Sequence, residues 1–171
     1  MLKKVITSLI VLSALCMPAL AQGTKVAIVD ADVIVQKSQK GKAFFEEFQK
    51  FTEGKRTEIE KMVEGFQAKQ KDLQAKAASM SEDKKKESAM ELQRLQTEIQ
   101  RAQEDAKRES DLRLNTALER FRKEIAPLVR QVAIEKGIDM VLNNGPNTGL
   151  VYFSDAVNLT DAVIKAYDES Q

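Results

Sequence analysis

The clearest pattern in the chain runs through residues 42–126, where apolar side chains recur with a helical period among charged and amide residues and no proline interrupts them. In the first half of this stretch the apolar positions lie three or four residues apart, and Lys55 and Gln70 fill two gaps in the series. The apolar members are Phe44, Phe48, Phe51, Ile59, Met62, Phe66, Leu73 and Ala77. Steps of four, three and four make an eleven-residue repeat, which is typical of a nearly straight or slightly right-handed helical pair.

A second long helix is predicted to start at Ser81, because its hydroxyl can cap free amides and two acids, Glu82 and Asp83, follow at the positive end of the helix dipole. The apolar stripe of this helix shifts once, at Ser110. Its members are Leu92, Leu95, Ile99, Ala102, Ala106, Leu114, Leu118, Phe121, Ile125 and Leu128. Residues 42–126 are therefore predicted to form an antiparallel helical hairpin, called the arm below, with its tip near residues 79–81.

Two glycines, Gly54 and Gly65, fall inside the first arm helix. Each is less favourable there than alanine by about 1 kcal/mol. They are open to two interpretations: glycines tolerated on the surface, or bending points that let the arm flex. The polar interruptions at Lys55 and Gln70 favour an arm that bends.

Short elements flank the arm and predict a small body. Before the arm, residues 26–30 form an apolar strand, Asp30 caps a helical turn over residues 31–36, and residues 38–41 form a loop. After the arm, the helix is kinked or restarted at Pro127 and stopped at Gly137. A strand at 138–142, a turn at 143–149 and a strand at 150–153 follow. The last predicted element is a helix at 161–167, capped by Thr160. The predicted fold class is α+β: a long antiparallel, coiled-coil-like α-helical hairpin projecting from a small β-rich oligomerisation body.

The body is assigned to residues 22–41 and 127–171. A unit of about 70 residues lies near the lower limit for stability without disulfides or metals. We therefore expect several chains to share one core, and a cyclic assembly with its arms pointing the same way would enclose a cavity. The side chains expected in this shared core are Val26, Ile28, Val29, Ile138, Met140, Leu142 and Val151.

The first 21 residues have the pattern of a secretory signal peptide. Lys3 and Lys4 precede a short apolar run, and small residues precede the expected cleavage between Ala21 and Gln22. The apolar run is shorter than the roughly 20 residues of a membrane-spanning helix, which argues against a retained anchor. A lipoprotein signal at Cys16 is disfavoured because the preceding residue is Leu15 rather than a small one.

The composition argues against an enzyme. The chain has no histidine and no tryptophan, and its single cysteine lies in the expected signal peptide. The usual neutral-pH base, the thiol nucleophile and the common zinc ligands are therefore missing from the expected mature protein. The glycines match no common phosphate-binding spacing. We expect no cofactor, no metal site and no use of ATP.

The order of these elements resembles the Skp/OmpH family of periplasmic chaperones. The resemblance rests on the strand Val26-Ala27-Ile28-Val29-Asp30, Ser38 with Gly41-Lys42, the long charged hairpin, Gly137-Ile138-Asp139-Met140-Val141-Leu142, and the closing Asp161-Ala162-Val163-Ile164 helix. It implies a homotrimer with a β-rich body and three helical arms. It also implies a periplasmic, ATP-independent holdase that shields unfolded outer-membrane β-barrel proteins in a cavity between the arms and delivers them for outer-membrane assembly.

The arm tip is the candidate client-binding region. Flexible, polarizable methionines there would suit contacts with many sequences, and a lysine cluster would attract acidic clients or the anionic headgroups of lipid or lipopolysaccharide. The residues concerned are Met80, Met90, Lys69, Lys71, Lys76, Lys84, Lys85 and Lys86. The alternative interpretation is a solvated turn, with methionines that only fill the helix seam.

The net charge sets this chain apart from the strongly basic members of that family. It carries 27 basic and 26 acidic residues, and loss of Lys3 and Lys4 with the signal peptide would leave a formal charge of −1. Near-neutral charge and export both argue against nucleic-acid binding. A structural or adaptor coiled-coil protein of the cell envelope, binding one folded partner, remains the alternative function.

Overall fold

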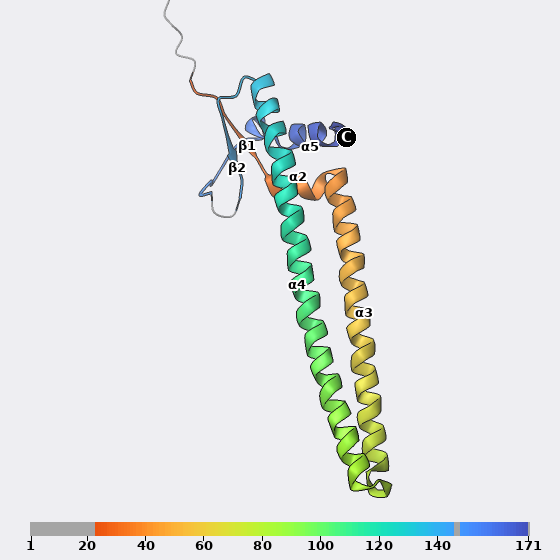
Figure 1. Ribbon diagram of the computed structural model, residues 1–171. Coiled ribbons are helices and arrows are strands. Elements are labelled where there is room, and N and C mark those ends of the chain that lie inside the picture. The colour runs from red at the N-terminus through yellow and green to blue at the C-terminus, as the bar shows by residue number, and fades with distance from the viewer. Residues whose placement is uncertain (1–22, 146–147, 171) are drawn as a thin grey trace, which may run out of the picture.

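A computed structural model describes residues 23–145 and 148–170, and two long helices dominate it (Figure 1). Helix α3 (Gln39–Lys76) and helix α4 (Glu82–Glu135) lie side by side and are joined by the short 3₁₀ turn η2 (Ala77–Ser79). At 1.5 Å per residue they are about 57 Å and about 81 Å long. A small body with a two-stranded sheet lies at the end away from the turn. The predicted fold class, a helical hairpin projecting from a small body that contains strands, is confirmed.

The seam between α3 and α4 follows the predicted stripe. Every apolar stripe position of α3 is half-buried, and so is Lys55, whereas Gln70 is exposed. On α4 the prediction for Leu118 is wrong, because Leu118 is 38% exposed and Ala117 is buried in its place. After the shift at Ser110, the next seam position thus comes three residues beyond Leu114 rather than four.

Three ion pairs cross the seam, and in each the lysine belongs to α3 and the glutamate to α4. Lys40 and Glu124 are 3.5 Å apart near the body, Lys55 and Glu109 are 3.1 Å apart in the middle, and Lys69 pairs with Glu91 near the tip. Such exposed pairs add little stability individually. Charged partners at fixed positions do favour one register of two helices over its neighbours.

The sheet is smaller than the sequence predicted. Strand β1 (Val26–Val29) pairs in parallel with β2 (Met140–Asn143), and Val26 lies opposite Met140. The prediction of a third strand at residues 150–153 is wrong for the single chain. The free edge of β1 is occupied by Asn158, through a parallel bridge to Ile28, so residues 150–153 have no strand to join there.

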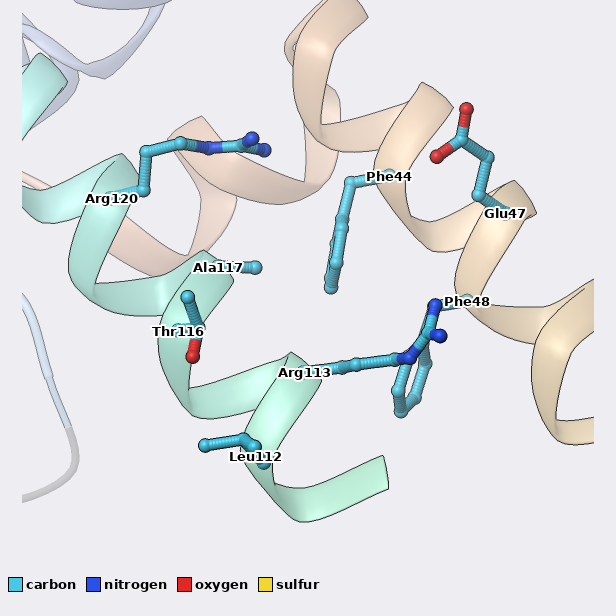
Figure 2. Close-up of a pocket in the computed structure, with 8 residues that line it drawn as sticks. All are labelled: Phe44, Glu47, Phe48, Leu112, Arg113, Thr116, Ala117 and Arg120. Carbon is cyan, nitrogen blue, oxygen red and sulfur yellow. The ribbon is translucent and has the colours of Figure 1, made fainter. Parts of the chain in front are cut away.

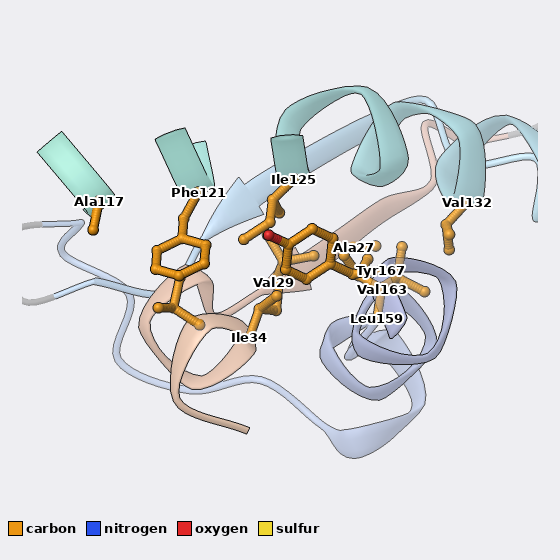
Figure 3. Close-up of a cluster of buried hydrophobic side chains, with 11 residues drawn as sticks. Ala27, Val29, Ile34, Ala117, Phe121, Ile125, Val132, Leu159, Val163 and Tyr167 are labelled. Atoms are coloured by element: carbon orange, nitrogen blue, oxygen red, sulfur yellow. The ribbon is translucent and has the colours of Figure 1, made fainter. Parts of the chain in front are cut away.

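The core of the body draws on both ends of the chain (Figure 3). Helices α2 (Ala31–Lys37) and α5 (Thr160–Glu169) cover the end of α4 and strand β1. The most deeply buried hydrophobic side chains are Ala27, Ile34, Phe121, Val163 and Tyr167, each at most 1% exposed. The first turns of the arm belong to this core, since Phe121 also packs edge-on against Phe44 of α3, with ring centroids 5.7 Å apart.

Side-chain caps define several element boundaries. Asp30 accepts a hydrogen bond from the Val33 amide at the start of α2, and Ser81 accepts one from the Lys84 amide at the start of α4, as predicted. The predicted loop at residues 38–41 is wrong. Ser38 alone separates α2 from α3, and its buried hydroxyl accepts from the Gly41 amide and donates to the Val35 carbonyl.

Two other boundary predictions need correction. Thr160 does not cap α5; its hydroxyl accepts from the Asp30 amide at 3.0 Å and so ties α5 to the end of β1. Pro127 does not restart the helix, because α4 runs from Glu82 to Glu135 with Pro127 inside it. Pro127 is exposed, so water can reach the carbonyl that its missing amide leaves free. Gly137 follows the end of α4 with a φ of 63°, as expected of a glycine that stops a helix.

Candidate functional site

The surface of the arm is the candidate site, because the candidate client-binding residues named from the sequence lie on it. Within residues 23–145 and 148–170, no three acidic, histidine or cysteine side chains cluster as metal ligands would. None of the helices in that part of the chain has the length and apolar character needed to cross a bilayer. The hollows along the arm are shallow and open, which suits contacts with a polymer better than enclosure of a small substrate.

At the tip, a hollow of about 200 Å³ lies between the two helices. It is lined by Lys69, Asp72, Leu73, Lys76, Met80, Ser88, Glu91 and Leu92. Three of the residues named from the sequence, Lys69, Lys76 and Met80, are thus brought together. The other five, Lys71, Lys84, Lys85, Lys86 and Met90, lie outside the hollow.

Acidic partners neutralise half of the lysines at the tip. Lys69 pairs with Glu91, and this hydrogen-bonded ammonium holds the pKa of the Glu91 carboxyl below its ordinary value. Lys76 lies 2.7 Å from Asp72, and Lys85 lies 2.7 Å from Glu82.

The remaining tip lysines, Lys71, Lys84 and Lys86, are exposed and form no ion pair with any residue that the structure describes. The unpaired positive charges of the tip are therefore these three lysines, and two exposed acids, Asp83 and Glu87, lie near them in the sequence. Met90, 64% exposed on α4, is the one large apolar side chain of the predicted set that faces solvent, whereas Met80 is half-buried in the hollow.

Where the arm joins the body, a second hollow of about 370 Å³ opens between α3 and α4 (Figure 2). We call it the root groove; it is lined by Phe44, Glu47, Phe48, Leu112, Arg113, Thr116, Ala117 and Arg120. Sequence reasoning placed Phe44 and Phe48 in the seam and missed the groove. The groove could have been predicted from the small side chains of Thr116 and Ala117, because the partner helix carries large aromatic residues.

The two arginines of the root groove differ in how firmly they are held. Arg113 lies 3.9 Å from the centroid of the Phe51 ring and donates to Glu109 at 2.9 Å. Hydrogen bonds lower the pKa of the Glu109 carboxyl, and the bond from Lys55 contributes more than the bond from Arg113. Arg120 is held loosely, 3.9 Å from Glu124, with a side chain that is 58% exposed.

Next to the root groove, Glu124 joins three helices. Its Oε2 atom accepts a hydrogen bond from the Tyr167 hydroxyl of α5 at 2.5 Å and lies 3.5 Å from Lys40 of α3. The Tyr167 hydrogen bond is the main reason that the pKa of Glu124 is lowered, with smaller contributions from Lys40 and Arg120. Burial and the Glu124 carboxylate raise the pKa of Tyr167 well above its ordinary value.

This junction predicts an effect of pH on stability. The folded pKa of Glu124 lies below the ordinary value of 4.5, so its contribution is present above that pH and is lost as the pH falls through the folded pKa. Tyr167→Phe removes the leading cause of this shift, and stability should then fall less steeply in acid. Urea unfolding between about pH 6 and pH 3 measures the slope. Tyr152→Phe, at an 81% exposed site, is the matched control, and equal slopes for Tyr167→Phe and wild type would refute the assignment.

The residues proposed for a shared core divide into two groups. Ile28 and Val29 are buried within their own chain, and Ile138 is half-buried. Val26, Met140, Leu142 and Val151 are 38%, 49%, 42% and 98% exposed. An uncovered apolar face of this kind is expected of a surface that meets another protein, and the shared core remains a prediction. The predicted cleavage residues Ala21 and Gln22, and the rest of the predicted signal peptide, lie outside the described residues.

Comparison with known proteins identifies the family. The sequence profile described as Outer membrane protein (OmpH-like) matches residues 25–167. A crystal structure from Caulobacter crescentus CB15, described as a candidate outer membrane chaperone (OmpH-like), has 22% sequence identity and a TM-score of 0.78, over 86% of each chain. That level of identity establishes a shared fold. No curated protein matches the sequence. Because the profile spans most of the chain and the fold agrees, this protein belongs to the Skp/OmpH family.

Proposed function

We propose that this protein is an ATP-independent periplasmic holdase for unfolded outer-membrane β-barrel proteins. Family membership supports a chaperone role at the outer membrane in general. The proposed client, the absence of nucleotide use and the periplasmic location are what the family resemblance implies, and the chain adds a signal-peptide pattern and the lack of a common phosphate-binding glycine spacing. An amino-terminal segment with the pattern of a signal peptide would export it.

The observation that carries the proposal is the open seam of the arm. Between Phe51 and Leu114 none of the arm's side chains is fully buried, although apolar residues line the whole seam. Most of this length lies away from the body, so the half-buried apolar side chains of the seam keep part of their surface in solvent, between charged neighbours. An unfolded barrel strand alternates apolar and polar side chains, and such a surface can hold it through many weak contacts without selecting one sequence.

We further propose that three chains assemble through their bodies and that their arms together surround the client. The exposed edge of β2 and the apolar side chains of Met140, Leu142 and Val151 support this arrangement. The three unpaired tip lysines, Lys71, Lys84 and Lys86, would draw acidic segments or anionic lipid and lipopolysaccharide headgroups toward the arm ends.

The test is suppression of aggregation. A urea-unfolded outer-membrane barrel protein is diluted into buffer with the purified mature chain and without nucleotide, and light scattering is followed. We expect scattering to fall at stoichiometric amounts of the chain, and the addition of ATP to change nothing. Scattering that stays unchanged would refute the holdase, and capture of one folded envelope protein instead would support the adaptor alternative.

A charge variant in the same assay tests the tip. Replacing Lys71, Lys84 and Lys86 by glutamine should slow client capture at low salt and leave it little changed at high salt, because exposed charges act mainly on association rates. A matched control replaces three exposed cations of the arm away from the tip, Lys61, Arg101 and Lys107, by glutamine; like the tip lysines, they form no ion pair with the described residues. Equal slowing by both variants would show that net charge, rather than its position at the tip, governs capture.

A further inference from the structure

The root groove exists because side chains of unequal size face each other across the arm. Phe44 and Phe48 of α3 stack at 5.7 Å between ring centroids, with 20° between their planes. The α4 surface opposite them offers Thr116 and Ala117, which are too small to cover the rings. Elsewhere on the seam Phe121 covers Phe44 from the body side. The result is an aromatic wall left open on one side (Figure 2).

The rim of the groove carries an exposed apolar group and an available cation. Leu112 is 65% exposed, an unusual state for a leucine on a helix with a narrow apolar stripe. Arg120 lies 3.9 Å from Glu124 and 5.2 Å from the centroid of the Phe121 ring, and it keeps most of its side chain in solvent. Arg113 is already paired with Glu109 and packed on Phe51. Its guanidinium group therefore offers the groove a flat surface for stacking, and its charge is already balanced by Glu109. The lining carries a single carboxylate, Glu47 on α3, against the two guanidinium groups of Arg113 and Arg120.

We propose that the root groove is an anchoring subsite for unfolded polypeptide. It binds an extended segment that places an aromatic side chain against Phe44, Phe48 and Leu112 and a nearby carboxylate side chain against Arg120. The inference rests on the proposed holdase function and deepens it by giving one part of the arm a preferred client sequence.

The chemistry of the lining selects this occupant. Aromatic rings gain edge-to-face and offset contacts with other rings, and the guanidinium of Arg113 offers a cation–π partner for the same guest. The hollow of about 370 Å³ is ample for one aromatic side chain. Side chains two residues apart on an extended chain point to the same side, so an aromatic residue and an acid in that spacing can both reach the arm. The loosely held Arg120 favours the acid over a base.

The experiment uses tryptophan peptides, because this chain has no tryptophan and the peptide alone gives the signal. The probe is acetyl-Ser-Trp-Ser-Asp-Ser-amide, and the comparison peptide has lysine in place of aspartate. Each is titrated with the full mature protein, and indole fluorescence is followed. We expect the acidic peptide to bind about two- to fivefold more tightly than the basic one, the range of an exposed ion pair.

Two variants with matched controls locate the binding. Thr116→Leu places a larger side chain in the groove, and leucine is a better helix former than threonine, so this variant should abolish binding of both peptides. Thr97→Leu, on the same helix but outside the groove, should leave the binding of both peptides unchanged. Arg120→Gln should remove the preference for the acidic peptide, and Arg108→Gln should keep it. Equal binding by wild type and Thr116→Leu, or a preference that survives Arg120→Gln, overturns the proposal.

The aggregation assay tests the anchoring subsite separately from the holdase function on which it rests. Thr116→Leu protein that remains folded should suppress aggregation of an unfolded barrel protein less effectively than Thr97→Leu protein. If the two variants suppress aggregation equally well, the groove is not an anchoring subsite and the holdase stands. If wild type itself fails to suppress aggregation, the holdase function is refuted independently of the groove.

Discussion

Replacing Gly41 by alanine should destabilise the protein by about 3 kcal/mol, the upper end of the usual cost of overpacking, because the added methyl group has no space. A Cβ at this position would lie 1.6 Å from the Val35 carbonyl oxygen and 3.0 Å from the Ser38 hydroxyl oxygen. The first of these atoms is backbone, so the α2–α3 corner itself would have to move. The same movement would break the hydrogen bond from the Gly41 amide to Ser38.

The matched control is the same substitution at Gly54, where a Cβ would meet nothing within 4 Å. Gly54→Ala should stabilise the arm by about 1 kcal/mol, the difference in helix propensity. Urea unfolding followed by far-UV circular dichroism, at one protein concentration for all variants, measures both effects. A Gly41→Ala protein as stable as wild type would show that the corner yields easily and that the glycine is not required there.

Phe121→Ala should cost about 3 to 5 kcal/mol, since it removes a fully buried ring from the place where the arm meets the body. Phe121 packs against Phe44 of α3 and belongs to the same buried cluster as Ile34 and Tyr167. The loss should therefore loosen both the root of the hairpin and the body. Stability of small domains totals only about 5 to 15 kcal/mol, so a large share of the protein should be unfolded at moderate urea.

Leu118→Ala is the control for this cavity, because Leu118 is one turn away on α4 and 38% exposed. It should cost about 1 to 2 kcal/mol, less than Phe121→Ala, since more than a third of Leu118 remains in solvent. Urea unfolding under the same conditions compares the two variants. Equal losses at Leu118 and Phe121 would mean that the root is held together by more than its core, for example by contacts of Leu118 with another chain.

The arm could be predicted in detail because its structure follows from local periodicity. Helix contacts join residues three or four apart, so the stripe from Phe44 to Ala77 specifies both the helix and the face that meets its partner. Capping is equally local, and the roles of Asp30, Ser81 and Gly137 agree with prediction. The single error on the stripe, Leu118 for Ala117, arose where the period shifts and two neighbouring positions compete.

The body was predicted less well because strand pairing joins residues far apart in the sequence. Residues 150–153 have the composition of a strand, but a strand exists only where another edge is free to receive it. In this chain Asn158 occupies the outer edge of β1, and residues 150–153 do not pair with the remaining edge of β2. The role of Thr160 was misjudged for a similar reason, since its partner, the Asp30 amide, is 130 residues away.

The sequence alone determined that this protein is a helical hairpin on a small body and a member of a recognisable family, because periodic hydrophobicity and caps act over a few residues. The tertiary structure alone decided which tip lysines are neutralised, where α4 leaves the aromatic wall uncovered and how Glu124 joins three helices. Each of these depends on which side chains meet across the α3–α4 seam and at the root. That meeting is set by helix register and by the packing of distant segments, which no local pattern encodes.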